Sequence, residues 1–282
     1  MSVVTLEQAV AKVRDLPSLP AVVAELIRTF GDADVATSEL AAQISKDQAL
    51  AAKTLRLANS SFYGLQSRVR TIDQAITVLG FDSVRSLVTA AGVVGQFRGT
   101  DGGAVDFTAF WRHAVGTAVC AKSLARLAGC KQEFAFVSGL LHDIGRLVLV
   151  TSFPEQYAAV LDCQRSTGSE VLHAERSVLG IDHALVGQAL ARHWKFPALI
   201  QRAIGHHHGP EREDLGDIAS VIHVANAIVH ALDLGGEPDE QVPAIAQDAW
   251  DSLRIDAPGL SRVFAETEAE FENACQILTA GE

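Results

Sequence analysis

The sequence has little that would support a disulfide framework or a zinc knuckle. Its four cysteines are scattered and form no C-x-x-C pair: they are Cys120, Cys130, Cys163 and Cys275. Such spacing is typical of reduced thiols in a cytoplasmic protein. No window approaches 18 uncharged apolar residues, and the N-terminus carries charges at helical spacing where a signal peptide would have an apolar core. We therefore predict a cytoplasmic protein with no transmembrane helix and no membrane partner.

Positive charge is also scarce. The chain has 23 Lys and Arg residues against 34 Asp and Glu residues, so its formal net charge is −11 and its pI is about 5.3. A surface of this sign repels phosphate backbones, which argues against DNA or RNA as a partner. It still allows a nucleotide in a local positive or metal-bearing pocket. A hydrophobic content of 48% over 282 residues is ordinary for a folded protein with a proper core.

The alternation of polar and apolar residues that marks β-strands is hard to find, and nearly every segment has a helical period. Between residues 37 and 60, for example, Leu40, Ile44 and Leu50 recur among Ala, Lys and Gln. We therefore predict an all-α protein. In the second half the predicted helices cover about 108–128, 132–150, 154–165, 170–178, 182–194, 197–206, 216–233 and 240–252.

A segment rich in Gly and Asp, residues 98–106, breaks the helical pattern and is the best candidate for a linker. It predicts an N-terminal helical bundle, residues 1–98, packed on a C-terminal helical bundle, residues 107–282. The last segment, 262–278, is only partly amphipathic. It either covers the core as a terminal helix, which is the commoner arrangement, or offers a surface to a partner.

Histidine is absent before this linker, and all ten histidines lie between His113 and His230. Any metal or acid–base chemistry is therefore expected in the second half. The apolar run 136-FVSGLLHDIGRLVLV-150 carries His142, Asp143 and Arg146 in its middle. Burying an imidazole beside a carboxylate costs several kcal/mol unless each group finds a partner. Coordination of a metal would satisfy both groups at once.

Each histidine alone is a weak signal. His113 and His183 are typical of core-edge histidines, and the triplet in 205-GHHHG-209 is either a solvated loop or a metal-binding tract. We assign three others to structure: His173, His193 and His230. Together, however, imidazoles and a carboxylate converging from different helices are the ligands that zinc, iron and manganese accept in helical bundles.

The pattern formed by His113 and 142-HDIGR-146 resembles the HD superfamily of metal-dependent phosphohydrolases. Over the whole chain, the segments that follow resemble the HDOD family, HD relatives found in bacterial signalling proteins. These segments are 17–30, 47–64, 71–88, 180–197, 202–209 and 221–228. The resemblance implies an N-terminal helical region packed against an HD-like helical bundle. It also implies that His113, His142 and Asp143 bind a divalent ion.

The resemblance extends to further ligands, with two departures. His183, His206 and His207 resemble the additional ligands of the HD-GYP phosphodiesterases, which hydrolyse cyclic di-GMP. The distant Asp of the HD motif is replaced by Asn226, which brings no charge and so lowers affinity for a dication. The second departure is that residues 206–217 contain no Gly-Tyr-Pro element. His223, three residues before Asn226, is either a substitute ligand or a helix-surface residue.

The candidate metal ligands are therefore His113, His142, Asp143, His183, His206, His207 and Asn226, for iron, manganese, zinc, nickel or magnesium. Arg146 and Lys195 are the only cations near enough to grip a phosphate. Our first hypothesis is a regulatory module that acts through contacts with signalling proteins and is not an enzyme; a homodimer is left open. The second is a phosphohydrolase or phosphodiesterase acting on a nucleotide or a cyclic dinucleotide. Asn226 favours the first.

Overall fold

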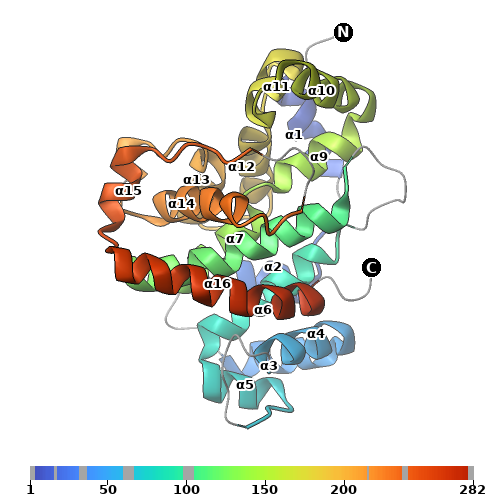
Figure 1. The fold of residues 1–282 in the computed structure, drawn as a ribbon. Helices are drawn as coiled ribbons and strands as arrows, with labels where there is room; N and C mark the ends of the chain where they lie inside the picture. The colour runs from blue at the N-terminus through green and yellow to red at the C-terminus, as the bar shows by residue number, and fades with distance from the viewer. Residues whose placement is uncertain are drawn as a thin grey trace.

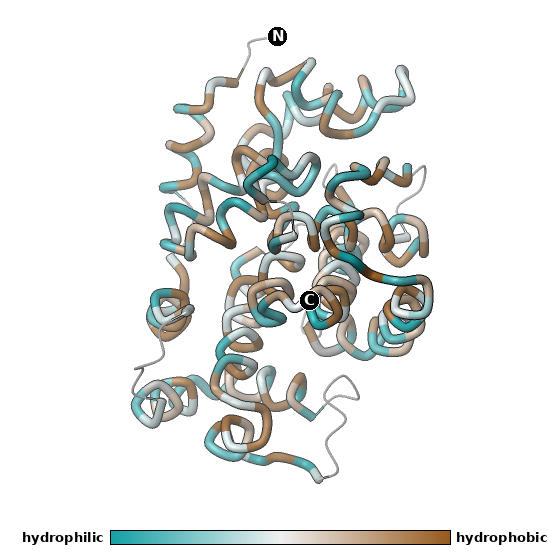
Figure 2. The backbone as a smooth tube through the Cα atoms, turned by 90° about the vertical axis from the view of Figure 1, so that its left-hand side faces the viewer, coloured by the Kyte–Doolittle hydropathy of each residue, from teal (hydrophilic) through white to brown (hydrophobic). Residues whose placement is uncertain are grey.

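The computed structural model describes residues 4–15, 18–31, 37–59, 67–97, 105–214, 216–236 and 241–278. These residues form helices joined by short turns, and none of them lies in a strand, so the predicted all-α class is confirmed (Figure 1). Residues 98–104 of the predicted linker lie outside the described residues. Hydrophilic and hydrophobic residues alternate along most helices, as amphipathic helices around a common core require (Figure 2).

The first half contains α1 (Leu6–Asp15), α2 (Ala21–Arg28), α3 (Thr37–Lys46), α4 (Gln48–Ala58), α5 (Ile72–Leu79) and α6 (Phe81–Val94). From residue 84 to residue 94 every side chain of α6 is buried. Helix α6 packs against α2, α4 and α5 on one side and against α8 of the second half on the other. It is therefore one of the elements through which the two halves share a core.

The end of α4 is tied to the chain ten residues later by one side chain. The Asn59 amide donates to the carbonyl oxygens of Leu55 (2.7 Å) and Val69 (2.8 Å), and its Oδ1 accepts the Val69 N–H (2.8 Å). Asparagine can do this because its amide carries both a donor and an acceptor. This contact positions the start of α5 relative to α4.

The second half contains α7 (Phe107–Ala128), α8 (Gln132–Leu141), α9 (Ile144–Ser152), α10 (Pro154–Thr167), α11 (Val171–Leu179), α12 (His183–His193), α13 (Ala198–His206), α14 (Ile218–Ala231), α15 (Gln247–Leu253) and α16 (Ala257–Leu278), with a short 3-10 turn, η2, at Arg212–Asp214. Helices α7 and α12 begin at aspartates, Asp106 and Asp182, whose side chains accept first-turn N–H groups. Helices α7, α10 and α11 end at glycines with positive φ. These boundaries lie close to the predicted ones.

Two predicted helices differ from the structure. The helix predicted at 132–150 is divided into α8 and α9, because His142 and Asp143 form a turn and Asp143 (φ −97°, ψ 7°) leaves the helical conformation. The helix predicted at 240–252 begins only at Gln247. Pro243 lacks an N–H group and disfavours a helical residue before it, which accounts for the non-helical segment 241–246.

The apolar stretch Gln132–Ser152, which holds α8 and α9, is long and apolar enough to cross a membrane, with a mean hydropathy of 1.5. Residues 134–150 of this stretch are all buried inside the protein. Its apolar character therefore serves the core. Among the described residues, no other helix meets the same criteria of length and hydropathy.

The two ends of the chain pack across the predicted division at residues 98–107. Helix α1 lies on α9 and α12 of the second half, and the Val4 N–H donates to the Leu179 carbonyl (2.9 Å) (Figure 1). Helix α16 runs along α7 and also contacts α4 and α6. Its own side chains Val263 and Phe271 are buried. The division into two units stays a prediction. Each predicted unit packs one terminal helix of the chain, α1 or α16, against the other unit.

Candidate metal centre

The histidine cluster lies where six helices of the second half meet. Each ligand-type residue sits near a helix end or on a face turned inward: His113 on α7, His142 and Asp143 between α8 and α9, His183 at the start of α12, His207 and His208 after α13, and Asn226 on α14. All of them except His208 are buried, and His142 and His183 have no exposed surface. Residues far apart in the sequence therefore share one enclosed space.

Two glycines allow the helices to approach closely enough to form this space. A Cβ atom on Gly145 would lie 2.0 Å from the His183 carbonyl oxygen. A Cβ atom on Gly139 would lie 2.8 Å from the Cα atom of Ala118 on α7. Glycine is required at both positions, because any side chain would separate α9 from α12 and α8 from α7.

One group of ligand atoms combines α7, the α8–α9 junction and α14. His113 Nε2 lies 3.2 Å from His142 Nε2 and 2.9 Å from Asn226 Oδ1. His142 Nε2 lies 3.5 Å from Asp143 Oδ1. The structure therefore places the Asn226 amide oxygen beside His113, and its role as a ligand stays a prediction.

A second group is built around the same carboxylate. Asp143 Oδ1 lies 3.2 Å from His183 Nε2 and 3.3 Å from His207 Nε2. The Nε2 atoms of His183 and His208 are 2.8 Å apart. The histidine and aspartate ligand atoms of each group lie within 4.8 Å of one another, and Asp143 belongs to both groups. A carboxylate shared in this way is typical of centres that hold two ions.

Backbone carbonyls orient two of the imidazoles. His142 Nδ1 donates to the Gly139 carbonyl (2.7 Å), and His207 Nδ1 donates to the Ile204 carbonyl (2.7 Å). An imidazole that donates through Nδ1 presents the lone pair of Nε2 on its other side. Both Nε2 atoms therefore face the centre as acceptors.

His183 is oriented by a carboxylate instead. Glu175, on α11 and with no exposed surface, accepts both the Nδ1 hydrogen (2.6 Å) and the backbone N–H (2.8 Å) of His183 at Oε2. Its other oxygen accepts the hydroxyl of Tyr157 (3.1 Å). Neither Glu175 nor Tyr157 was among the predicted site residues, because their contacts depend on how α10, α11 and α12 pack together.

Burial and charge set the protonation of the centre. Burial lowers the pKa of His142 to about 4, although the Asp143 carboxylate acts in the opposite direction. For His183, burial is outweighed by the Glu175 and Asp143 carboxylates, which raise its pKa to about 10. Burial would raise the pKa of Asp143, but His142 and His183 hold it well below its usual range. Asp143 is therefore ionised and available as a ligand.

These residues fit a divalent ion. His207 Nε2 is buried and makes no hydrogen bond, and the lone pair of His142 Nε2 is likewise directed into the centre. A cation between such atoms satisfies them together, whereas protons cannot, because several acceptors point at one small space. Neutral imidazole and carboxylate are ligands for zinc, iron and manganese.

Two predicted residues lie apart from these groups. His206 ends α13 and is outside both groups, while the neighbouring His208 faces His183. Consecutive residues near a helix end turn by about 100°, so the triplet cannot direct all three rings to one side. Lys195 is exposed beyond the last turn of α12, whose 11 residues span about 16 Å from His183. Arg146 lies at the centre, 3.5 Å from Asp143 Oδ2.

His223, considered as a substitute ligand, uses both ring nitrogens elsewhere. Its Nδ1 donates to the His207 carbonyl (2.7 Å), and its Nε2 accepts the Ala246 N–H (2.9 Å). It therefore supports the backbone of a ligand residue. His230, assigned to structure, packs against His113 with ring centroids 4.5 Å apart.

An all-helical protein with a buried centre of imidazoles around one aspartate has the architecture of the HD superfamily. The family model of the HDOD domain matches residues 16–210, and this chain belongs to that family, as the sequence motifs predicted. A curated relative from Treponema pallidum, named only as an uncharacterized protein, is 30% identical over 93% of this chain. The chain spans about half the length of that relative.

Solved structures have the same fold. A Shewanella amazonensis protein provisionally named a phosphohydrolase is 31% identical, with a TM-score of 0.78 over 96% of this chain and 97% of its own. An HDOD domain protein from Geobacter sulfurreducens is 24% identical, with a TM-score of 0.78 over 98% of this chain and 99% of its own. At that identity the second likeness concerns the fold alone.

Proposed function

We propose that this chain is a regulatory module of bacterial signal transduction that acts through contacts with signalling proteins and holds divalent ions as part of its folded structure. The observation that carries the proposal is Asp143, whose Oδ1 lies within 3.5 Å of three imidazole Nε2 atoms inside the core. Ions held there connect α7, the α8–α9 junction, α12, α13 and α14. Their binding free energy would add directly to the stability of this arrangement.

Burial supports a regulatory over a hydrolytic role. The rings of His113, His142, His183 and His207 are almost completely enclosed. A phosphate ester the size of a cyclic dinucleotide needs a cleft and several positive groups. Arg146 contacts the centre through Asp143, but it is a single positive group.

The second candidate is a metal-dependent phosphohydrolase, and the shared carboxylate is the observation that favours it. A pair of bound ions would supply a hydroxide and polarise a phosphoryl oxygen. In that case Glu175 would keep His183 Nε2 directed at the centre, and Arg146 would hold a phosphate oxygen. Asn226 would leave the His113 group with one negative charge fewer than an aspartate would provide.

Metal content and hydrolysis, measured on the same preparations, test both candidates. Protein purified without chelator is analysed for metals by mass spectrometry and then assayed with bis(p-nitrophenyl) phosphate and cyclic di-GMP in the presence of Mn²⁺ or Fe²⁺. The variants are His142→Ala and the control His173→Ala. The His173 side chain is 67% exposed and belongs to neither ligand group. We expect bound metal in the wild type and His173→Ala, loss of metal in His142→Ala, and no turnover.

Turnover that His142→Ala abolishes and His173→Ala retains would replace the regulatory proposal by the hydrolytic one. A wild-type protein that binds no divalent ion would contradict both, because each assigns ligand roles to the same imidazoles.

A further inference from the structure

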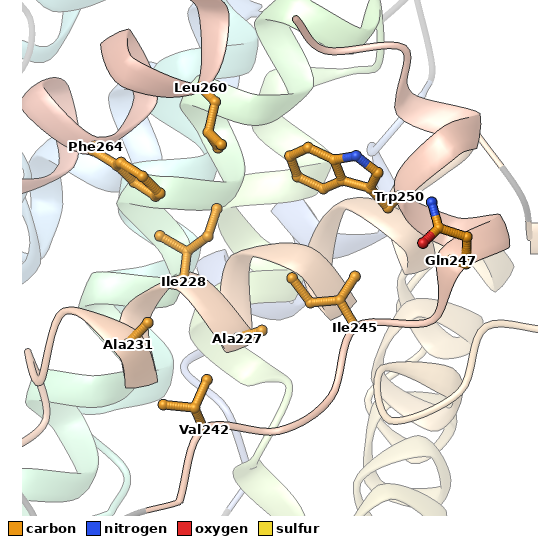
Figure 3. Close-up of a pocket in the computed structure, with 9 residues that line it drawn as sticks. All are labelled: Ala227, Ile228, Ala231, Val242, Ile245, Gln247, Trp250, Leu260 and Phe264. Carbon is orange, nitrogen blue, oxygen red and sulfur yellow. The ribbon is translucent and has the colours of Figure 1, made fainter. Parts of the chain in front are cut away.

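The surface beside α14 contains an apolar groove that the metal centre does not use. Helices α14, α15 and α16 and the segment 241–246 enclose a space of about 310 Å³ (Figure 3). Ile228, Trp250 and Phe264 form its walls, and the lining side chains that can form hydrogen bonds are Gln247 and, through its indole N–H, Trp250. The groove therefore offers mainly apolar contact.

Part of this wall faces solvent. Val242 is 57% exposed and Ile245 is 39% exposed, and both lie on the non-helical segment between α14 and α15. Adjacent large apolar side chains exposed along a groove mark interaction sites more often than isolated ones do. A cavity of roughly 150 Å³ holds one benzene ring, so this groove has room for about two large apolar side chains.

The elements around the groove are acidic. Residues 241–278 carry seven Asp or Glu residues against two Arg residues and no Lys, and two of the seven, Glu266 and Glu272, pair with arginines of α7. Asp248, Asp251 and Glu268 are among those exposed to solvent. A partner that brings Lys or Arg residues alongside its apolar side chains would complement this charge, whereas an acidic partner would be repelled.

We infer that this groove docks an amphipathic helix of a partner protein, with two large apolar side chains in the groove and basic residues beside them. The inference rests on the proposed action through protein contacts, and it names the surface and the kind of partner. Two faces of the groove are helix surfaces, from α14 and α16, which is the usual form of a groove that takes a helix.

The groove is also connected to the metal centre through His223. The N–H of Ala246, next to Ile245 in the groove wall, donates to His223 Nε2 (2.9 Å). His223 Nδ1 in turn donates to the carbonyl of His207, a residue of the second ligand group (2.7 Å). A helix that displaces Ile245 therefore acts on the His207 backbone through two hydrogen bonds. Docking and ion binding should accordingly change each other's affinity by the same factor.

Docking is tested by fluorescence anisotropy with a fluorescein-labelled 18-residue peptide. The peptide has Leu and Phe at helical positions i, i+3, i+4 and i+7 and Lys on its other face, and a scrambled peptide of the same composition is the control. We expect micromolar binding of the first peptide alone. Replacing its Lys residues by Glu should weaken binding at least tenfold.

Matched protein variants locate the site. Val242→Glu and Ile245→Glu change exposed residues of the groove wall, so both should fold, as circular dichroism will verify. Each should weaken peptide binding at least tenfold. Val78→Glu, at a position 54% exposed on α5, should leave it unchanged.

Several results would overturn the inference. These are equal affinity of Val242→Glu and the wild type, equal binding of the scrambled peptide, or no binding. Concentration-dependent dimers that Val242→Glu converts to monomers would assign the groove to a second copy of this chain. Binding of N-phenyl-1-naphthylamine without binding of the peptide would assign it to a small apolar molecule.

The connection to the centre is tested by measuring peptide affinity with and without Zn²⁺. We expect at least a threefold difference in the wild type and none in His223→Ala, with peptide binding itself retained. If His223→Ala does not fold, His223→Gln replaces it in this measurement. A difference that persists in the variant, or none in a wild type that binds Zn²⁺, would overturn the connection. Peptide binding without Zn²⁺ binding would contradict the metal proposal and leave docking in place.

Discussion

At the scale of single residues, the side chain that most strongly constrains the centre is Glu175. Its carboxylate accepts three hydrogen bonds in the core, two from His183 and one from Tyr157. It fixes the orientation of the His183 ring, with Nδ1 donating to Glu175 and Nε2 facing Asp143. A residue that orients a ligand without touching the ion often controls metal affinity nearly as much as the ligand does.

Replacement of Glu175 by Gln should reduce metal affinity by about tenfold to a hundredfold, because an uncharged amide oxygen accepts the two His183 hydrogens more weakly than a carboxylate does. Affinity is measured by competition with a chromophoric chelator. Tyr157→Phe, which removes only the third hydrogen bond, should cost about 1 kcal/mol of stability and leave affinity within a few-fold. Equal affinity of Glu175→Gln and the wild type would show that His183 needs no such orientation.

At the scale of secondary-structure elements, the centre depends on how closely helices approach one another. The contact of α9 with α12 at Gly145 leaves no room for a Cβ atom. The contact of α16 with α7 is made by ion pairs at its edge: Arg126 Nη2 lies 2.6 Å from both Glu266 oxygens, and Ser123 also donates to Glu266.

Gly145→Ala should destabilise the protein by about 1–3 kcal/mol or more and lower its metal content, because α9 must move away from the His183 backbone. Gly209→Ala, where a Cβ atom would meet nothing within 4 Å, is the matched control and should change little. Thermal unfolding and metal analysis measure the two effects. Unfolding temperatures that agree for both variants would contradict the close approach of α9 and α12.

The Glu266 contact makes stability depend on pH. Burial opposes the shift, but hydrogen bonds from Ser123 and Arg126 hold the pKa of Glu266 below its usual value of 4.5. A carboxylate with a lowered folded-state pKa contributes stability above the unfolded pKa, and that contribution is lost as the pH falls through the folded value.

Glu266→Gln should therefore reduce the free energy of unfolding by up to about 1 kcal/mol at pH 7, as expected of a half-exposed pair, and should have less effect as the pH falls below 4.5. Urea unfolding at several pH values measures the difference. Glu268→Gln, exposed on the same helix, is the control. An effect of Glu266→Gln that does not decrease at low pH would contradict a charge-based contact.

At the scale of the whole molecule, the two predicted units contact each other through the helices at both ends of the chain. Helix α1 completes the bundle around α9 and α12, and α16 reaches back to α4 and α6. Ala9 and Val13 of α1 are buried. The second half therefore depends on a segment at the far end of the chain.

A fragment of residues 105–278, which lacks α1 to α6, should unfold at least about 5 °C below the whole chain. A loss of 1 kcal/mol in the free energy of unfolding corresponds to about 2–4 °C at this size. Circular dichroism at 222 nm during heating measures the shift. A fragment that unfolds at the same temperature and with the same cooperativity would establish residues 107–282 as an independent unit.

Much of this protein follows from its sequence alone. Helical periodicity, aspartate caps and terminal glycines are local signals, so the all-α class and most helix bounds could be predicted. The motif around 142-HDIGR-146 and the other histidines, with Asn226, likewise identified most residues of the cluster and the family.

Only the tertiary structure decided the rest, because it depends on contacts between residues far apart in the chain. Helical pattern cannot reveal that His142 and Asp143 form a turn, that His208 faces His183 in place of His206, or that Glu175 lies behind His183. These outcomes are set by how several helices converge. The groove beside α14 was likewise decided by the tertiary structure. Its walls come from separate segments, and each of their apolar residues taken alone is typical of a buried core residue.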